Sequence, residues 1–382
     1  MSSTTTTTTT TAVKPNSGTA VPDIAAAGDD HQTQAEWLSA NGVVDPSARI
    51  AMARLSHVRY QHPDLEEIST FLADFGAVVA KREGDEVWYK GYGPDQYVYY
   101  ARQGPKKFLG GAFEVGTMDE LKRASKLPGA GAIEEMRNAP GGGFMLTVVD
   151  PEGFPFNLVY GQEPVTTTAT AGGALPEKLP FNYEVEKERV RKFQRFQTGP
   201  AAIHKLGHFG YTTVKFSEMV SFYTKNFNLV PSDCMYVKTG AGEEGKGGDG
   251  GAGGGAGDGR RVATIFFHLD LGDALVDHHC LFIGGGGASA HVHHASFEVH
   301  DFDTQALGHR WLARRGYKSV WGVGRHVLGS QIFDYWRDTS GNMVEHYADG
   351  DLVNRRSPVA FVEAGSDSLA IWGPEVPADF LG

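Results

Sequence analysis

The sequence predicts an α+β fold of two homologous domains, each a pair of βαβββ modules whose curved mixed sheet surrounds a cup. Three observations support this prediction. The order strand, helix and then several strands occurs four times along the chain. One half of the chain repeats motifs of the other half, and repeated motifs indicate repeated structural units. At 382 residues the chain is also too long for a single ordinary core.

Several segments lack the periodicity of helices or strands. A threonine run, Thr4–Thr11, is followed by small and polar residues, so we expect a disordered, low-complexity tail over residues 1–50. A glycine-rich stretch at 239–259 reads as an expanded surface loop inside the second domain. The predicted division of the chain is a first domain at 51–165, a linker at 166–200, a second domain at 201–350 and a C-terminal tail at 351–382.

The repeat consists of three pairs of strand-like segments. In chain order, LSHVRY matches LGHFGY, FLGGAFEV matches VHHASFEV, and DPEGFPFN matches DTSGNMVE. The residues at the key position of each pair are His57 and His208, Gly110 and His294, and Asn157 and Glu345. The first half keeps only one residue of metal-binding type, so we expect a degenerate site there and a metal site in the second half alone.

Each module also requires a helix, and helical patterns lie between the strands. The predicted helices span 64–75 and 118–125 in the first half, and 218–228 and 304–315 in the second.

In the strand that begins at His294, period-two alternation places His294 and Ser296 on one face, and Ala295 and Phe297 on the other. The apolar face would pack under helices, so His294 would point into the open side of the sheet.

The most informative residues of the second half are His208, His294 and Glu345. Together they supply two imidazoles and one carboxylate. Such a set is a facial triad, which holds a non-haem Fe(II) on one face of an octahedron and leaves the opposite positions open. An oxygen-donor substrate and O2 could then bind side by side. The triad therefore predicts metal-centred oxygen chemistry.

Composition and charge argue against several classes of partner. The formal net charge is −11, whereas nucleic-acid backbones and anionic membranes favour a basic surface, so we expect neither partner. Cys234 and Cys280 are too few for a disulfide framework, and no run of about 18 apolar residues could span a bilayer. The N-terminus has no basic start followed by an apolar stretch, which predicts a cytoplasmic rather than a secreted protein.

Motifs of the second half match a known family. The segment HHASF contains His294, and the turn DTSGN leads to Glu345. In GRHVLGSQIFDYWRDTSGN, His326 and Tyr335 are nine residues apart, and Tyr335 precedes Glu345 by ten. With these motifs the chain, from about residue 54 to 350, resembles the type I extradiol ring-cleavage dioxygenases of the vicinal oxygen chelate superfamily. The last segment looks most like the catechol 2,3-dioxygenase and trihydroxytoluene oxygenase branch.

The resemblance implies a function and roles for further residues. The family opens an aromatic vicinal diol with O2 beside its hydroxyls, at Fe(II) or alternatively Mn(II). Its acid–base histidine maps to His278, with His279 as the competing position because the match there is short. Tyr335 would hydrogen-bond the substrate oxygen, and His326 would line the distal side of the pocket. The implied partners are a small aromatic diol and O2, and a homo-oligomer is compatible with the family.

Other functions remain open at this point. They are a glyoxalase-type isomerase, an enzyme like 4-hydroxyphenylpyruvate dioxygenase, cleavage of an o-aminophenol, and a non-catalytic module that binds an aromatic ligand. The set His278, His326 and Tyr335 favours a dioxygenase, because glyoxalase-type isomerases usually need a further protein ligand or base in the cup. A binding module would have no use for a complete triad with three additional polar groups around it.

Most of the remaining histidines are expected to be ordinary, because the chain contains 15 of them. His204 could pair with His208 only on a helix, which the strand pattern disfavours. His293 lies on the opposite strand face from His294, so packing or a hydrogen bond is expected of it. Cys280 is expected to be a small buried residue. The histidines expected on the surface or in the core are His268, His291, His300, His309 and His346.

Overall fold

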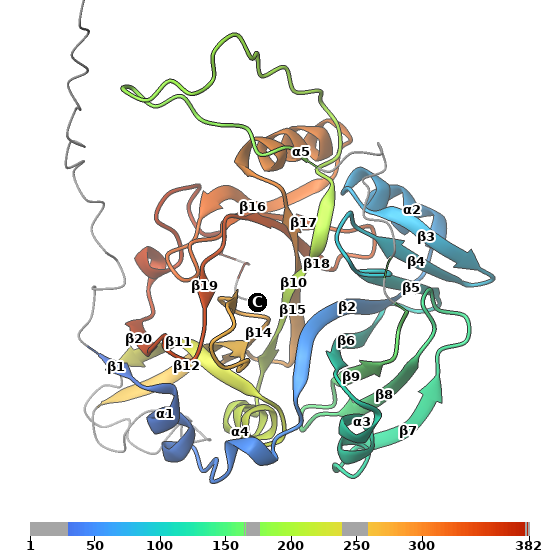
Figure 1. Ribbon diagram of the computed structural model, residues 1–382, viewed down its shortest axis with the longest axis vertical. Coiled ribbons are helices and arrows are strands. Elements are labelled where there is room, and N and C mark those ends of the chain that lie inside the picture. Colours follow the sequence, from blue (N-terminus) through green and yellow to red (C-terminus); the bar gives the residue numbers. More distant parts are fainter. Residues whose placement is uncertain (1–29, 164, 166–175, 239–258, 379, 381–382) are drawn as a thin grey trace, which may run out of the picture.

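The computed structural model describes residues 30–163, 165, 176–238, 259–378 and 380. These residues form an eight-stranded sheet, a ten-stranded sheet and a short two-stranded sheet. The two large sheets lie side by side (Figure 1). The glycine-rich stretch, apart from Gly259, and residues 1–29 of the predicted tail lie outside the described residues. Among the described residues, no helix is long and apolar enough to cross a bilayer.

Two βαβββ modules build the eight-stranded sheet of the first half. The strand order is β3-β4-β5-β2-β6-β9-β8-β7, so the first strands of the two modules, β2 and β6, meet antiparallel at the centre. The first module comprises β2 (Met52–His62), α2 (Leu65–Asp74), β3 (Val78–Glu83), β4 (Glu86–Lys90) and β5 (Tyr99–Gln103). The second comprises β6 (Lys107–Val115), α3 (Met118–Ala124), β7 (Ala130–Glu135), β8 (Phe144–Val149) and β9 (Pro155–Tyr160).

The second half repeats this arrangement, with the order β11-β12-β14-β10-β15-β18-β17-β16, and β20 and β1 extend the edge at β11. Its first module comprises β10 (Ile203–Thr213), α4 (Phe216–Asn226), β11 (Leu229–Lys238), β12 (Arg260–Leu269) and β14 (Leu281–Gly285). Its second comprises β15 (His291–Val299), α5 (Phe302–Arg314), β16 (Lys318–Arg325), β17 (Ile332–Arg337) and β18 (Met343–Ala348). The added strands are β1 (His31–Gln32), β13 (Val276–Asp277), β19 (Leu352–Val353), which pairs with β13, and β20 (Val359–Glu363).

The strand register of the second half reproduces that of the first. In each half, the first and the third key residues pair with one and the same residue of the strand that lies between them. The trios are His57, Ala112 and Asn157 in the first half, and His208, Ser296 and Glu345 in the second. Identical pairing in both halves confirms the predicted α+β fold of two homologous units built from four modules.

Each of the four predicted helices is present, and its ends lie within two residues of the prediction. The starts are set by capping side chains. The carboxylate of Asp64 accepts hydrogen bonds from the backbone N–H groups of Glu66 and Glu67 at the start of α2. Asp301 accepts from the N–H of Thr304, and so α5 begins two residues before its apolar pattern does.

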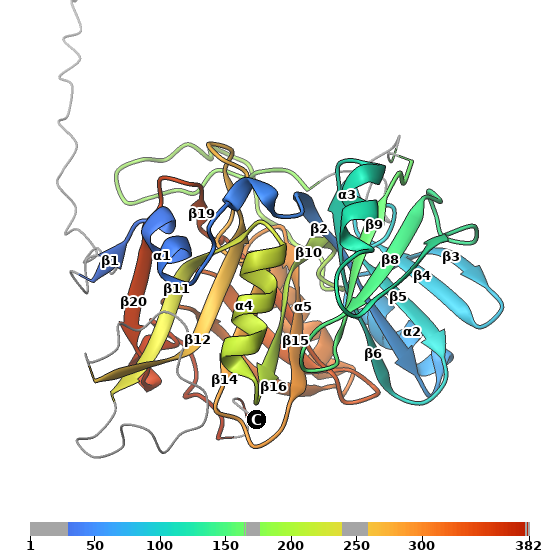
Figure 2. The same ribbon diagram turned by 90° about the horizontal axis from the view of Figure 1, so that it is seen from below.

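The predicted disordered tail is wrong for residues 30–50, which form ordered structure against the second domain (Figure 2). Helix α1 (Gln34–Ala40) begins with a capping box between Thr33 and Glu36. Trp37 is fully buried and packs edge-on against an aromatic ring of β12. A seven-residue helix shows too little periodicity to be recognised, and its apolar side gains a partner only after the sheet has formed.

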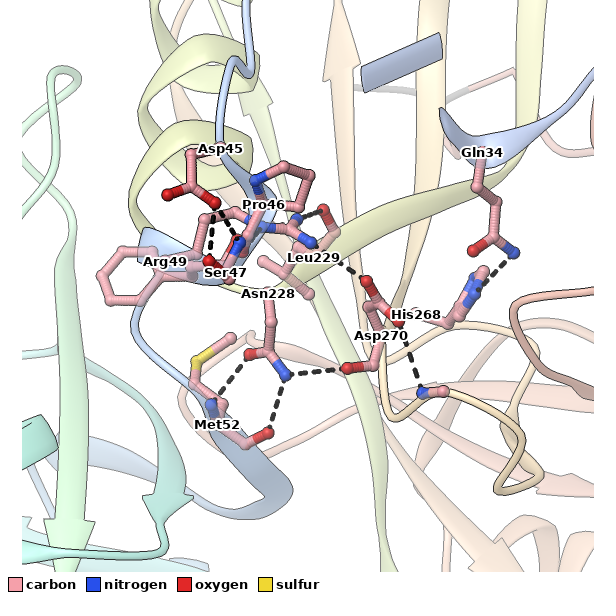
Figure 3. Close-up of polar contacts among 12 residues, drawn as sticks. Gln34, Asp45, Pro46, Ser47, Arg49, Met52, Asn228, Leu229, His268 and Asp270 are labelled. Carbon is pink, nitrogen blue, oxygen red and sulfur yellow. Dashed lines mark hydrogen bonds and ion pairs between the residues drawn. The ribbon is translucent and has the colours of Figure 1, made fainter. Parts of the chain in front are cut away.

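Hydrogen bonds and an ion pair connect residues 49–52, at the end of this N-terminal segment, to the second domain (Figure 3). After the short helix η2 (Pro46–Ala48), the guanidinium of Arg49 donates to the carbonyl of Leu229 at 3.0 Å and forms an ion pair with Asp270 at 3.0 Å. The side chain of Asn228 accepts from the N–H of Met52 at 2.8 Å and donates to its carbonyl at 3.0 Å. Since β2 begins at Met52, these contacts fix its start relative to β11.

Aromatic side chains join the two halves in one core, where β2 and β10 lie next to each other. From the first half, Phe108 and Phe113 project between the sheets, and from the second half Phe209 and Tyr211 meet them at ring-centroid distances of 6.0 to 6.2 Å. Gly111 makes this approach possible, because a Cβ there would lie 2.2 Å from the ring of Phe209. The first half therefore supports the strand that carries His208.

Candidate active site and metal centre

Three neighbouring strands of the second domain carry the predicted metal ligands. His208 lies on β10, His294 on β15 and Glu345 on β18. Strand β15 lies between the other two, antiparallel to β10 and parallel to β18. All three side chains are buried, and their ligand atoms lie within 4.8 Å of one another. The structure thus brings together all three residues that the sequence singled out.

The distances between these atoms fit a single metal ion. Nε2 of His208 lies 3.0 Å from Nε2 of His294 and 3.1 Å from Oε2 of Glu345, and Nε2 of His294 lies 3.3 Å from the same oxygen. Bonds from a divalent metal to nitrogen or oxygen are about 2.1 Å, so two ligands at right angles around one ion lie about 3.0 Å apart. Three such separations correspond to three ligands on one octahedral face.

The charges of the cluster also fit a cation. Glu345 is completely buried, and neither carboxylate oxygen accepts a hydrogen bond of ordinary geometry from a described residue. Burial alone would raise the pKa of Glu345, but contacts with His208, His294 and His326 hold it well below its ordinary value. Burial lowers the pKa of His208 to about 4. At neutral pH an ionised carboxylate and an uncharged imidazole therefore converge, which is costly unless a cation binds there.

Small residues leave room for these ligands on the concave face. Gly210 pairs with His294 across the β10–β15 ladder. A Cβ at Gly210 would lie 2.1 Å from the ring of Phe282. That ring lies in turn 5.0 Å, between centroids, from the ring of His294. Glycine at this position thus lets Phe282 pack beside the metal ligand and limits the directions in which His294 can turn.

A chain of hydrogen bonds sets the tautomer of His294. Nε2 of His293 lies 2.7 Å from the carbonyl oxygen of Phe380, which can only accept, so this nitrogen carries a proton. Burial lowers the pKa of His293 to about 3, so its ring is neutral and its Nδ1 is an acceptor. That Nδ1 lies 2.7 Å from Nδ1 of His294, which must donate. The lone pair of His294 is therefore on Nε2, the atom directed at Glu345.

A second pair of predicted residues, His326 and Tyr335, lies beside the triad. Nδ1 of His326 donates to the carbonyl of Leu369 at 2.8 Å, so its Nε2 accepts from the hydroxyl of Tyr335 at 2.9 Å. Nε2 of His326 also lies 3.8 Å from Oε1 of Glu345. The ring of Tyr335 lies 5.1 Å from that of His294. Burial and the nearby Glu345 raise the pKa of Tyr335 well above its ordinary value, so the phenol keeps its proton.

Residues 369–378 and 380, which we call the C-terminal strap, supply the acceptors for both pairs. The carbonyls of Leu369 and Phe380 hold His326 and His293, and the carbonyl of Pro374 accepts from the indole of Trp321 at 2.9 Å. The ring of Phe380 packs 4.9 Å from that of Tyr335. No side-chain pattern in the predicted tail at 351–382 could indicate this role, because a backbone carbonyl accepts regardless of its side chain.

The structure distinguishes the two candidate acid–base histidines. The ring of His279 packs against that of His208, with centroids 4.1 Å apart. His278 makes no contact of this kind with a metal ligand among the described residues. Its Nε2 instead lies 2.6 Å from Oδ2 of Asp233, and its Nδ1 lies 3.1 Å from Nδ1 of His279. Of the three predicted catalytic residues, His326 and Tyr335 thus adjoin the triad directly, whereas His278 reaches it through His279.

The sequence model of the Glyoxalase/Bleomycin resistance protein/Dioxygenase superfamily matches residues 205–346. This range contains the three metal-ligand candidates together with His278, His279, His326 and Tyr335. The second half of the chain is thus similar to this superfamily over the residues that carry the triad. Metapyrocatechase 2 from Cupriavidus necator is 28% identical over 361 residues, which is 92% of this chain and 98% of the relative.

Several solved structures share the fold over most of the chain. Homoprotocatechuate 2,3-dioxygenase from Arthrobacter globiformis superposes with a TM-score of 0.67 at 16% identity, covering 88% of this chain and 94% of that one. The Mn(II)-bound glyoxalase from Novosphingobium aromaticivorans has a TM-score of 0.63 at 18% identity, covering 86% and 93%. At these identities the likeness establishes the fold and leaves the activity to the residues of the site.

The equivalent positions of the first domain differ from those of the metal-ligand candidates. Gly110 has a φ of +102°, and a Cβ there would lie 2.3 Å from the side chain of Asn157 and 2.5 Å from a backbone oxygen. Asn157 donates to the carbonyls of Leu109 and Gly111. The ring of Tyr97 packs against His57 at 4.3 Å, in the space beside the remaining histidine. Asn157 thus bonds to backbone, and of the three key positions only His57 offers a metal-ligand atom.

The remaining histidines have ordinary partners. Nδ1 of His204 lies 2.8 Å from a carboxylate oxygen of Glu298, and this residue takes no part in the triad. His346 donates to the carbonyl of Phe75 at 2.7 Å, on the other side of β18 from Glu345. His268 bonds to Ser232 at 2.7 Å. The others bond to nearby acceptors: His291 to Ser289, His300 to Glu177 and His309 to Asp334.

Proposed function

We propose that this protein is an extradiol dioxygenase, which opens the ring of a catechol-type aromatic diol with O2 beside the two hydroxyls. The carrying observation is the facial triad of His208, His294 and Glu345 with the His326–Tyr335 pair next to it. The likeness to metapyrocatechase along nearly the whole of both chains supports the same activity. A triad alone would suit other metalloenzymes of the superfamily, whereas the additional hydrogen-bonding pair suits a bound diol.

We further propose that the resident metal is Fe(II), with Mn(II) as the alternative. Neutral imidazoles and one carboxylate leave a dication with net positive charge, which favours binding of a diolate. A metal held by His208, His294 and Glu345 would supply neighbouring positions for the diol and O2 and a path for electron density between them. The same donor set serves both metals, so the preference is decided by loading experiments.

The side chains around the triad would bind and orient the diol. Tyr335 is protonated and buried, and its hydroxyl can turn from His326 to donate to a substrate oxygen. His326, held by Leu369, would keep an unprotonated Nε2 beside that oxygen. The ring of Phe282 would form an apolar wall next to His294. The C-terminal strap packs against His326, His293 and Tyr335 and would limit the access of water to the bound diol.

The proposed substrates are small: an aromatic diol, or an o-aminophenol as a close variant, together with O2. The acidic charge of −11 supports neither a nucleic-acid nor a membrane partner. Both cysteines of the chain are free and buried, which agrees with a reducing compartment, and we propose the cytoplasm. A homo-oligomer remains part of the proposal by analogy with the superfamily.

Anaerobic loading with Fe(II) or Mn(II), followed by oxygen uptake and absorbance scans on a panel of catechols and aminophenols, tests this function. We expect uptake of one O2 per diol and a yellow ring-fission product. Glu345→Gln should abolish uptake, because an amide neither supplies the anionic ligand nor balances the cation. Glyoxalase-type isomerisation of a thiol adduct is assayed in parallel. Isomerase activity without oxygen uptake on any diol would overturn the proposal.

A further inference from the structure

An extended segment between the two domains presents apolar side chains to solvent. Residues 176–198, which we call the arm, precede β10 and lie within the predicted linker. Figure 1 shows the arm as a long loop that leaves the body beside α5. Its large apolar side chains are between 45% and 81% exposed, and they are Phe181, Tyr183, Val185, Val190, Phe193 and Phe196. A contiguous apolar surface of this kind marks an interaction site.

Local hydrogen bonds give the arm a definite shape. The side chain of Asn182 accepts from the N–H of Arg189 at 2.7 Å and donates to its carbonyl at 3.1 Å. Asn182 also forms an antiparallel bridge with Lys187, which closes the loop at the tip. At the base of the arm, Nε2 of His300 lies 3.3 Å from the carbonyl oxygen of Glu177. The arm is therefore shaped by its own bonds, while its apolar side chains stay uncovered.

A second group of exposed apolar residues lies beside the base of the arm. The rings of Phe302, which begins α5, and Trp372, in the C-terminal strap, lie 6.0 Å apart between centroids, and Ile371 is exposed next to them. His300, which contacts the arm, shortly precedes Phe302 in the chain. Every exposed aromatic side chain among the described residues belongs to the arm or to this pair. Aromatic residues are enriched at protein–protein interfaces, so this side of the molecule is the best candidate for one.

The charges of the arm differ between its two limbs, residues 181–188 and 189–196. Apart from Lys187, the first limb carries only acidic charges and the second only basic ones. The residues concerned are Glu184, Glu186 and Glu188 on the first limb, and Arg189, Arg191, Lys192 and Arg195 on the second. None of these side chains forms an ion pair with another described residue. In a two-fold interface the same surface lies on both sides, so each acidic limb can face the basic limb of the other copy.

We propose that the arm and the Phe302–Trp372 pair form a two-fold interface with a second copy of this chain. The acidic limb of each arm lies along the basic limb of the other, and the rings of the arm cover the partner's Phe302–Trp372 pair. A standard interface takes about 20 to 30 residues from each chain, which the arm, the start of α5 and the strap together supply. A nucleic acid or an anionic membrane fits less well, because three glutamates lie beside the basic residues. The inference goes beyond the proposed catalytic function and gives the proposed homo-oligomer a defined surface.

Sedimentation velocity of the full-length protein tests whether the arm joins two copies. We expect the wild type to sediment as a dimer or as a larger assembly with an even number of chains. Phe193→Ser removes a ring that is 76% exposed and should raise the dissociation constant about 30-fold or more, as for other aromatic anchors. The control is Val44→Ser, at a 97% exposed position between α1 and η2, which should associate like the wild type. Equal association of Phe193→Ser and Val44→Ser, or a monomeric wild type, would overturn the proposal.

Charge reversal tests the pairing of the limbs. One variant combines Glu184→Lys, Glu186→Lys and Glu188→Lys, and the other combines Arg189→Glu, Arg191→Glu and Lys192→Glu. Each variant alone brings like charges together, so its self-association should weaken about 10-fold or more, with a larger effect at low salt. An equimolar mixture should form a heterodimer, because the limbs of the two variants carry opposite charges. A mixture that associates no better than the separate variants would overturn the pairing.

Limited digestion with trypsin distinguishes a second copy from other occupants. The cleavage sites in the two limbs include Lys187, Arg189, Arg191 and Lys192. If a second copy covers the arm, cleavage should slow as the protein concentration rises, and Phe193→Ser should remove this protection. Slow cleavage at every concentration would place the arm on its own chain, and fast cleavage at every concentration would leave it to a different partner. Either of these results overturns the proposal.

The proposed interface and the proposed function fail separately. Sedimentation and digestion need neither metal nor substrate, so they decide the interface even if the wild type consumes no oxygen with any diol. A monomeric wild type that opens a diol would overturn only the interface.

Discussion

At the residue scale, hydrogen bonds to neighbouring groups decide which ring nitrogen of His294 carries a proton. His294 keeps its lone pair on Nε2 because His293, held by the carbonyl of Phe380, accepts at Nδ1. His208 lacks such a partner, and its Nδ1 makes no hydrogen bond to a described residue. The two metal-ligand candidates thus differ in how they are positioned, His294 by hydrogen bonding and His208 by packing against His279 and Tyr347.

We predict that His293→Ala lowers metal affinity about 10- to 100-fold, since loss of the partner behind a metal ligand frees its tautomer and orientation. Equilibrium dialysis with Fe(II) under argon measures the change. His291→Ala, two residues earlier on the same strand, is the control, because its ring bonds to the carbonyl of Ser289 and not to a metal-ligand candidate. If both variants bind the metal like the wild type, the hydrogen bond to His294 has no role in metal binding.

At the element scale, the C-terminal strap joins two site histidines that lie far apart in sequence. Its carbonyls at Leu369 and Phe380 order His326 and His293, respectively. The strap also packs the ring of Phe380 on Trp321 and Tyr335, at 4.7 and 4.9 Å between centroids. One segment therefore contacts both His293, which bonds to the metal-ligand candidate His294, and the His326–Tyr335 pair.

We predict that truncation after Glu375 lowers both metal affinity and kcat/KM by about 10-fold or more while the sheets stay folded, because His293 loses its acceptor. Metal dialysis, oxygen uptake and circular dichroism measure the three properties. Phe380→Leu keeps the carbonyl and most of the apolar contact, so it should retain nearly wild-type metal affinity. Wild-type metal affinity in the truncated protein would contradict the role given to the carbonyl.

The N-terminal helix α1 is a second element whose role is structural. Trp37 is fully buried, and its removal would leave a large cavity against the second domain. We predict that Trp37→Ala lowers the free energy of unfolding by about 3 to 5 kcal/mol. Urea unfolding measures the change, with Val44→Ala, at a position that is 97% exposed, as the neutral control. A change below about 1 kcal/mol for Trp37→Ala would show that α1 adds little to stability.

At the scale of the whole molecule, one half carries the site and the other supports it. The first half keeps the register of the metal-binding strands, but Gly110 and Asn157 occupy two of the key positions and Tyr97 packs beside His57. Its aromatic residues instead pack behind β10. The duplication thus provides a rigid base for the strand that carries His208.

Several buried histidines should make the stability of the whole molecule depend on pH. Burial lowers the pKa of His62 to about 4 and that of His268 to about 3, whereas both titrate near 6.5 in the unfolded chain. Between these values the unfolded state binds protons that the folded state does not. The stability present above about pH 6.5 is therefore lost as the pH falls towards 4.

We accordingly predict that the urea midpoint of the metal-free protein falls between pH 7 and pH 4.5. The metal-free form is used because proton competition for the ligands would add a second pH dependence. His268→Gln should make the fall shallower, since it removes one of the titrating groups while an amide can still bond to Ser232. A midpoint that is flat or rises over this range would contradict the assignment of neutral buried imidazoles.

The sequence by itself determined the duplicated α+β fold, the four helices and the three metal-ligand candidates. These features depend on local periodicity and on repeated motifs, which fix the strand faces of His208 and His294 without knowledge of distant contacts. The family resemblance also singled out His326 and Tyr335. His326 lies in the turn between β16 and β17, and Tyr335 lies on β17 opposite Glu345.

Only the tertiary structure decided which of His278 and His279 faces the triad, and which carbonyls hold the site histidines. Adjacent residues in an irregular segment have no fixed alternation, so their directions depend on Asp233, Ser232 and Asp351 from distant parts of the chain. The strap and α1 were missed for the same reason. Short segments stabilised by contacts with an already formed sheet carry little periodic signal of their own.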